Sequence, residues 1–152
     1  MYRKTPVVTL ALVAASLAAP LFAAPADQIR ARIAAYRELG SAFKAVNDGL
    51  RGSEVQTVLI GQYARQISNH ARSQYALFPA GTGPQPGVNT NAKPEIWTRA
   101  AEFRTAQDNF ARAANSFLAA ANGGNVNAIR SEVRKLGGTC KGCHDTFRTP
   151  KD

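Results

Sequence analysis

Residues 125–148 read NVNAIRSEVRKLGGTCKGCHDTFR, and this stretch decides how the fold is interpreted. Its apolar positions are spaced alternately by three and four residues: Val126, Ile129, Val133, Leu136, Cys140, Cys143 and Phe147. That spacing is the period of an α-helix with one buried face, and Asn125 is a residue type that caps helix N-termini. The pattern therefore predicts a helix from about residue 126, with both cysteines on its core face.

The same period occurs in three earlier segments of the chain. The predicted core positions are Ile29, Ile33, Tyr36, Leu39 or Gly40, Phe43, Val46 and Leu50 in the first, Ile60, Ala64, Ile67, Ala71, Tyr75 and Phe78 in the second, and Ile96, Ala100, Phe103, Phe110, Ala114, Phe117 and Ala121 in the third. Little room is left for strands. We predict an all-α protein, an antiparallel four-helix bundle.

Capping residues, prolines and glycines predict where these helices begin and end. Ser53-x-x-Gln56 has the form of a capping box for the second helix, and Pro94 suits the first position of the third. Gly123-Gly124 should end the third helix. Residues 79–93 contain three prolines and three glycines, which predicts a longer loop between the second and third helices.

The N-terminus predicts an exported protein. Basic residues at positions 3 and 4 precede an uncharged apolar stretch, 7–22, and then small residues at 23–26. This is the layout of a secretory signal peptide, and Pro20 argues against a membrane anchor. We expect residues 1–24 to be removed, with the exact site open. Residues 25–152 then form one periplasmic domain without a membrane attachment.

The mature chain is expected to be basic, with 17 Lys and Arg against 10 Asp and Glu once Arg3 and Lys4 are removed. This excess suits anionic partners, but the absence of a Lys/Arg run fits equally well with a solvated helical surface. An exported chain without a basic aromatic patch is not expected to bind nucleic acid.

The chemistry is concentrated in Cys140-Lys141-Gly142-Cys143-His144, which contains both cysteines of the chain. Cys-x-x-Cys-His is the attachment signature of haem c. Thiols three residues apart on a helix can reach the two vinyl groups on one edge of a porphyrin, and the following imidazole can reach the iron. We predict one covalently bound haem c, held by Cys140 and Cys143, with His144 as its iron ligand.

Other interpretations of the motif remain. A disulfide between Cys140 and Cys143 would close a very small loop and stabilise little. A thiol oxidoreductase of the thioredoxin type would need a βαβ context. A zinc site needs a fourth ligand, for which only His70 is available. A Cys₂His metal-binding interaction module is therefore the rival of a different class.

Several motifs together resemble the class II c-type cytochromes, the cytochrome c′ family, over essentially all of the predicted mature chain. They are Arg32 followed by Leu39-Gly40 and Phe43-Lys44, Phe78-Pro79-Ala80-Gly81-Thr82, Lys93-Pro94-Glu95-Ile96-Trp97, and Leu136-Gly137-x-x-Cys-Lys-x-Cys-His-Asp145-x-Phe147-Arg148. In that family the haem motif lies near the C-terminus of a four-helix bundle.

The resemblance implies roles for residues outside the motif. Arg148 matches a basic residue near the proximal imidazole, and Arg32 an arginine near the haem propionates. Ile33 stands where the family usually has a haem-contacting glutamine, so it loses the polar contact. Thr90, with Asn91, is expected at the propionate edge. The aromatic residues of the third helix, with Trp97, are expected to be core.

The resemblance also bears on partners and function. It allows a homodimer through the first two helices, to which the apolar residues Val55, Val58 and Leu59 could contribute unless they pad the end of the bundle. We expect a haem protein that carries one electron, binds NO or CO, or does both. Its redox partner is not identifiable. We expect no enzyme, because no second titratable constellation accompanies the haem.

The sixth iron position is argued by elimination. The only methionine, Met1, is lost with the signal peptide, and Tyr36 stands where the low-spin branch of the family has its methionine ligand. Phenolate ligation by Tyr36 would need a lowered pKa, for which Arg32 is the available cation. We expect Tyr36 to cover the distal face and leave the iron five-coordinate. The alternative is a low-spin electron-transfer cytochrome with His144 and His70 as ligands.

Overall fold

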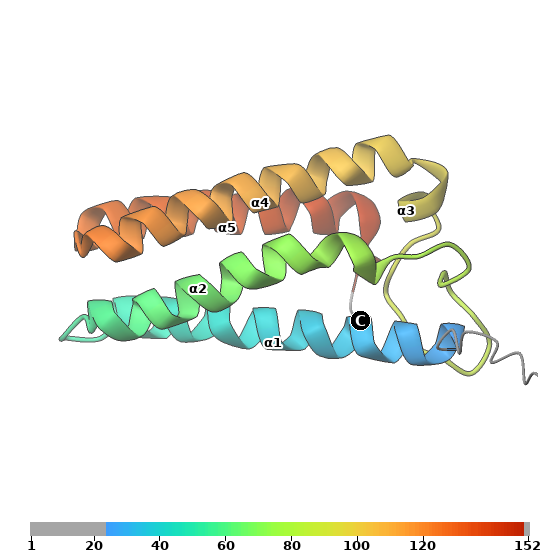
Figure 1. Ribbon diagram of the computed structural model, residues 1–152, viewed down its shortest axis with the longest axis horizontal. Helices are drawn as coiled ribbons and strands as arrows, with labels where there is room; N and C mark the ends of the chain where they lie inside the picture. The colour runs from blue at the N-terminus through green and yellow to red at the C-terminus, as the bar shows by residue number, and fades with distance from the viewer. Residues whose placement is uncertain (1–23, 151–152) are drawn as a thin grey trace, which may run out of the picture.

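The computed structural model describes residues 24–150 as four long helices that run alternately up and down (Figure 1). They are α1 (Pro25–Arg51), α2 (Thr57–Ser73), α4 (Ala100–Gly123) and α5 (Val126–Phe147). The crossover adds a 3-10 turn, η1 (Gln74–Leu77), and the short α3 (Glu95–Thr98). The all-α bundle with a long loop between its second and third long helices is confirmed. The predicted signal peptide lies, apart from Ala24, outside the described residues.

The predicted C-terminal end of α4 and the predicted N-terminal cap of α5 are confirmed. Asn125 caps α5, its side-chain oxygen accepting a hydrogen bond from the backbone N–H of Ala128 at 3.0 Å. Gly124 follows α4 with φ of +70°, a left-handed conformation that glycine adopts without strain. These two residues turn the chain between α4 and α5.

The predicted capping box at Ser53 is wrong. The first helix continues to Arg51 with Leu50 buried, so the turn that reverses the chain takes up Ser53. The second helix starts only at Thr57, and the side chain of Gln56 makes no capping hydrogen bond. The burial of apolar residues along α1 up to Leu50 therefore determines where the turn falls, in spite of the local capping sequence at Ser53.

The predicted third helix is broken in two. The backbone of Arg99, with φ of −118° and ψ of 47°, separates α3 from α4. The break lets Trp97 face the crossover loop, where its indole N–H donates to the Pro79 carbonyl at 3.1 Å. Ala100, a predicted core position, is exposed as a result.

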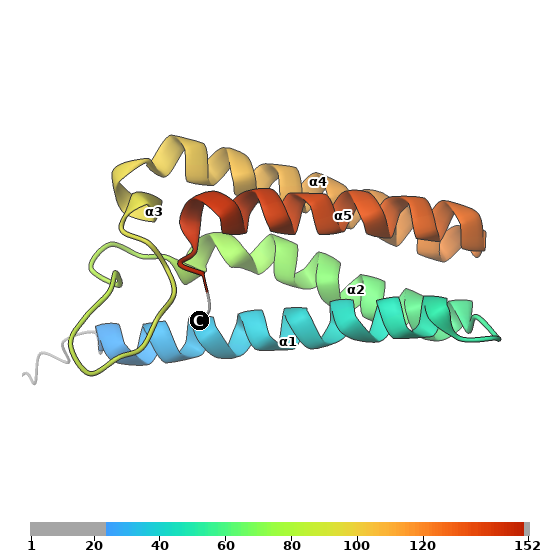
Figure 2. The same ribbon diagram turned by 180° about the vertical axis from the view of Figure 1, so that it is seen from behind.

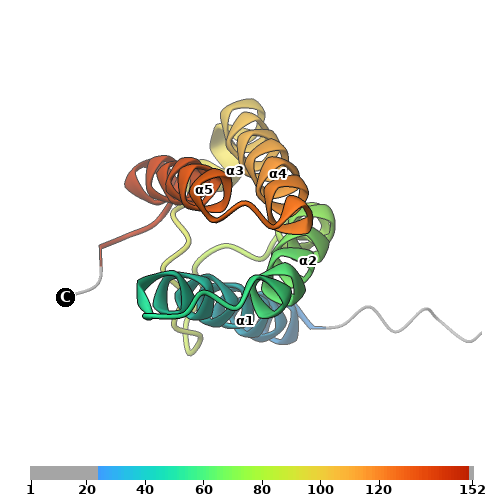
Figure 3. The same cartoon turned by 90° about the vertical axis from the view of Figure 1, so that its left-hand side faces the viewer.

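The packed elements form three sides of a square. The closely packed pairs are α1 with α2, α2 with α4 and α4 with α5. The fourth side, between α5 and α1, lacks that close backbone packing (Figure 3). Seen from behind, α5 and α1 run one above the other (Figure 2). No helix within residues 24–150 combines the length and apolar character needed to cross a membrane.

The buried core is divided into two clusters. The larger cluster consists of Ala42, Val46, Leu50, Ile60, Ala64, Ile67, Ala71, Phe110, Ala114, Phe117, Ala121, Ile129, Val133 and Leu136. The smaller one consists of Ile96, Phe103 and Phe147 and lies at the end that carries the crossover loop. Cys140 packs against the larger cluster and Cys143 against the smaller one. The core is thus interrupted beside the attachment motif.

Two neighbouring glycines on α5 provide a test of this packing. A methyl group on Gly138 would meet no atom within 4 Å, whereas one on Gly137 would lie 3.3 Å from Cζ of Phe43. Because alanine is the better helix former, Gly138→Ala should raise the free energy of unfolding by about 0.5–1 kcal/mol. Gly137→Ala should raise the free energy of unfolding by less, because its methyl group would crowd the Phe43 ring. Urea unfolding checks both, and an equal gain would contradict the close approach of α1 and α5 at Phe43.

Candidate functional site

The two cysteines lie half-buried on α5 and are not joined by a disulfide. Burial raises the pKa of both thiols, to about 11 for Cys143, where the neighbouring Cys140 adds to the effect. A redox-active cysteine needs a lowered pKa, because the thiolate is the nucleophile. The site therefore does not have the electrostatics of a thiol oxidoreductase, and both thiols are available for a cofactor.

His144 follows the cysteines on the exposed side of α5. Loss of solvation, and next the positive charge of Arg148, lower the pKa of its imidazole, while Asp145 acts in the opposite direction. A neutral imidazole has a free nitrogen lone pair, which is the form that ligates a metal. Arg148 thus lies close enough to act on the imidazole, as the resemblance implies. Asp145 itself forms an exposed ion pair with Lys141 at 2.5 Å.

Arg32 is the buried cation of the site, with only 3% of its surface exposed. Its guanidinium donates to the backbone carbonyl of Thr82 at 2.9 Å and to the hydroxyl of the same residue at 3.0 Å. Longer bonds reach the Leu77 carbonyl at 3.3 Å and the Thr90 hydroxyl at 3.5 Å. The Phe78 ring lies 4.8 Å and the Trp97 ring 5.6 Å from the guanidinium carbon.

No carboxylate among residues 24–150 forms an ion pair with Arg32. Burial lowers its pKa, which reflects the cost of desolvating an unpaired guanidinium. A buried cation without an acidic partner is costly unless an anion approaches it. The environment of Arg32 therefore fits a cofactor that brings carboxylates, such as haem propionates.

The crossover loop connects Arg32 with the end of α5. Thr90 accepts the hydrogen bond from Arg32, and the next residue, Asn91, accepts one from the backbone N–H of Thr149 at 2.9 Å. The N–H of Lys93 donates to the Phe147 carbonyl at 3.0 Å. Thr90 and Asn91 therefore lie in the same part of the molecule as Arg32 and Arg148, as the resemblance implies.

Tyr36 lies one turn after Arg32 on the inner side of α1, across the bundle from the cysteines. Burial, and next the proximity of Cys143, raise the pKa of its phenol well above the usual value, and the opposing effect of Arg32 is smaller. Phenolate ligation at neutral pH is therefore disfavoured. Ile33, the other predicted site residue of this turn, is half-buried.

His70 is half-buried on α2. Its Nε2 is fully buried and is the one buried side-chain nitrogen or oxygen without a hydrogen-bond partner in the part of the chain that the structure describes. The His70 ring meets the Tyr36 ring edge to face, with centroids 4.8 Å apart. His70 lies at the edge of the buried face of α2, which includes Ser68 and packs against both α1 and α4.

Sequence reasoning missed the role of Thr82. Its side chain is buried, accepts a hydrogen bond from Arg32 and donates one to the Pro79 carbonyl at 2.8 Å. The residue lies in an irregular loop, where helical periodicity carries no information. The run Phe78 to Thr82 was noticeable only through the resemblance.

The residues present fit a haem c. One helix offers two free thiols and a neutral imidazole, the core is interrupted beside them, and a buried guanidinium lacks a counter-charge. The residues that would hold the group are Cys140, Cys143, His144 and Arg32. Within residues 24–150, no group of three or more His, Cys, Asp or Glu side chains is placed to hold a metal ion.

Comparison with known proteins agrees with this fit. The sequence pattern of the family described as Cytochrome C' matches residues 27–148. The cytochrome c' of Rubrivivax gelatinosus is 32% identical, over 84% of this chain and 98% of that protein. A solved cytochrome c' described as having an unusual ligand-controlled dimer dissociation superposes with a TM-score of 0.80 at 27% identity, over 85% of this chain and 99% of the other. A nitric oxide complex of a mutant cytochrome c prime from Alcaligenes xylosoxidans superposes with a TM-score of 0.78 at 28% identity, over 86% of this chain and 99% of the other.

Removing the guanidinium of Arg32 should destabilise the protein. Arg32→Leu leaves the carbonyls of Leu77 and Thr82 without their donor, which should cost about 1–3 kcal/mol of unfolding free energy. Arg30→Leu is the matched control, because Arg30 forms only an exposed ion pair with Asp27 and its loss should change stability by about 0.5 kcal/mol or less. Urea unfolding measures both, and equal effects would contradict the role given to Arg32.

Proposed function

Since the chain belongs to the cytochrome c′ family, we propose that it is a periplasmic haem c protein that binds a small diatomic gas, carries one electron, or does both. Its cofactor is one covalently attached haem c. The observation that carries the proposal is the position of the Cys140 and Cys143 thiols, which face an interruption of the core opposite Tyr36. Within this proposal the protein performs no enzymatic reaction.

Each residue of the attachment motif has a distinct task. The thiols of Cys140 and Cys143 would form the thioether tether, and the imidazole of His144 would ligate the iron. When bound, haem supplies an iron that cycles between two oxidation states and accepts axial ligands. Loss of solvation, and next the positive charge of Arg148, favour the neutral imidazole of His144, and Arg32 would supply the positive charge for the propionates.

Tyr36 determines access to the other axial position. Its raised pKa keeps it a neutral phenol, which is a poor ligand for iron at neutral pH. The Tyr36 ring packs between the rings of His70 and Phe78, with centroid distances of 4.8 Å and 5.9 Å. We expect it to cover the distal face, so that the iron stays five-coordinate and mainly high spin. An incoming NO or CO then has to displace the ring.

The alternative function is that of a low-spin electron-transfer cytochrome with His144 and His70 as ligands. It is supported by the buried, unpartnered Nε2 of His70. The Tyr36 ring packs edge to face against the His70 ring, with centroids 4.8 Å apart, which favours the five-coordinate form. The Cys₂His interaction module is less favoured, because it accounts neither for the interrupted core nor for the buried Arg32.

The proposed location follows from the N-terminus. The family match begins at residue 27 and α1 begins at Pro25, so the predicted signal peptide of residues 1–24 precedes the bundle. We propose that it is removed on export and that the redox partner, which the chain does not identify, is met in the periplasm.

A homodimer through α1 and α2 is part of the proposal. Val58 and Leu59 are 77% and 41% exposed at the start of α2, whereas Val55 packs against the larger core cluster. Of the three apolar residues named for this contact, only Val58 and Leu59 are available to a second subunit. The solved relative with ligand-controlled dimer dissociation supports the formation of a dimer here.

The covalent tether is tested by removing the thiols. Protein with Cys140→Ser and Cys143→Ser, produced with the haem-maturation machinery, should release all its haem into acidic acetone, while the unaltered protein keeps it. His144→Ala should retain the thioethers but lose the axial imidazole, and its Soret band should change. Haem that stays with the double variant after extraction would show that the tether is elsewhere.

The role of Tyr36 is tested by CO binding to the ferrous protein. Tyr36→Ala removes the ring that the gas must displace, so the association rate should rise. Tyr63→Ala is the control, since Tyr63 lies on α2 and packs against the larger core cluster away from the motif. Stopped-flow mixing measures both rates. An unchanged rate in Tyr36→Ala would contradict the covering role.

A further inference from the structure

His70 is a half-buried polar side chain with a fully buried Nε2, and the favoured five-coordinate form leaves it unused. Other buried polar groups of the bundle have partners. Gln74 and Gln107 exchange side-chain to backbone hydrogen bonds at 3.1 and 3.4 Å, and Ser68 pairs with Asn115 at 3.1 Å. Only Nε2 of His70 is buried without a partner within the described chain. A buried unpaired nitrogen costs stability, so its retention calls for another explanation.

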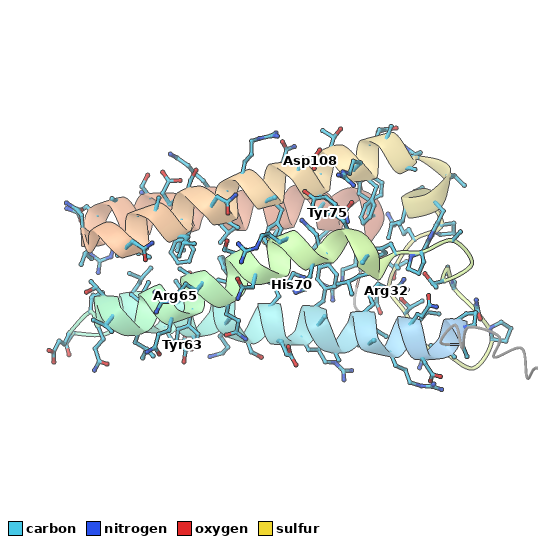
Figure 4. All side chains as sticks on the ribbon, in the orientation of Figure 1. Arg32, Tyr63, Arg65, His70, Tyr75 and Asp108 are labelled. Carbon is cyan, nitrogen blue, oxygen red and sulfur yellow. The ribbon has the colours of Figure 1, made fainter. Side chains whose placement is uncertain are left out.

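The position of the ring indicates what that nitrogen could meet. The ring of His70 packs against that of Phe110 in the larger cluster, with centroids 6.5 Å apart. The ring of its neighbour Tyr36 packs against that of Phe78, beside the smaller cluster, with centroids 5.9 Å apart. The His70 and Tyr36 pair therefore spans the interruption of the core, on the α1 and α2 side. In Figure 4, His70 lies between α2 and α1 in the half of the bundle that carries Arg32.

The chemistry of His70 suits a neutral hydrogen-bonding group. Burial lowers the pKa of its imidazole, with a smaller opposing effect from Glu38. A neutral imidazole carries one donor and one acceptor nitrogen. Arg32 is not a competitor for this task, because its guanidinium is held by Leu77, Thr82 and Thr90. Polarity and hydrogen-bond donors on the distal side of a haem decide which ligands it holds.

We propose that His70 is a polar distal residue whose Nε2–H donates a hydrogen bond to a ligand at the sixth iron position once the Tyr36 ring has moved aside. The ligand class that it favours is small and polar or anionic. This inference rests on the proposed function, since it needs the haem between α1 and α5. Tyr36 then limits how fast a ligand enters, and His70 determines how firmly a polar ligand is held.

The test uses the haem-loaded full-length protein with fluoride and carbon monoxide as probes. A hydrogen bond of ordinary net strength corresponds to roughly tenfold in a binding constant. His70→Leu should therefore weaken fluoride binding to the ferric protein by about tenfold. It should also shift the C–O stretching band of the ferrous complex to higher frequency, because a donor at the oxygen increases back-donation from the iron. His70→Gln, which keeps a donor, should restore both readouts in part.

A control separates the hydrogen bond from the added apolar side chain. Gln66→Leu places the same residue on the exposed face of α2, one turn earlier, and should leave fluoride affinity and the C–O band unchanged. If His70→Leu behaves like Gln66→Leu, the proposal is wrong while the proposed function stands. A low-spin ferric EPR signal that disappears in His70→Leu would also overturn it, because His70 would then be an iron ligand. Failure of the proposed function would instead appear as absence of covalent haem in every variant.

Discussion

The need to surround one buried positive charge organises the end of the bundle that holds the site. A guanidinium removed from water must recover its hydrogen bonds from protein acceptors. Arg32 does so with the carbonyls and hydroxyls of the segment that follows α2. Those bonds draw the crossover loop over the N-terminal half of α1. The stacking of Trp97 on the same guanidinium explains why α3 turns away from the axis of α4.

The interrupted core is the second determinant of the site. A bundle of this length could bury one continuous apolar column, yet the buried residues form two clusters with Cys140 and Cys143 between them. The larger cluster packs all four long helices at the end remote from the crossover loop, so that part of the molecule has a complete core of its own. The end near the loop is short of apolar packing, and a large planar apolar cofactor would supply it.

The helices and the attachment motif could be predicted from the sequence because both depend on local spacing. The stripe from Ile129 to Phe147 and the cap at Asn125 depend on residues within one or two turns. The broken third helix, the displaced start of α2 and the acceptor role of Thr82 could not be predicted. They depend on contacts between segments tens of residues apart, such as Arg32 with Thr82. Nor could helical periodicity show that Nε2 of His70 lacks a hydrogen-bond partner, because that depends on the side chains of the neighbouring helices.

The contacts between the crossover loop and the end of α5 also affect how the protein opens locally. The last turn of a helix ordinarily frays at little cost in free energy. Here the residues after His144 are bound to the loop by the Lys93 to Phe147 and Thr149 to Asn91 hydrogen bonds, and the loop is bound to α1 through Thr82 and Arg32. Fraying of the terminus must break bonds in a second segment. We therefore expect the imidazole-bearing turn and the loop to exchange their amide hydrogens as one cooperative unit, with the turn at Phe147 protected more than a fraying helix end.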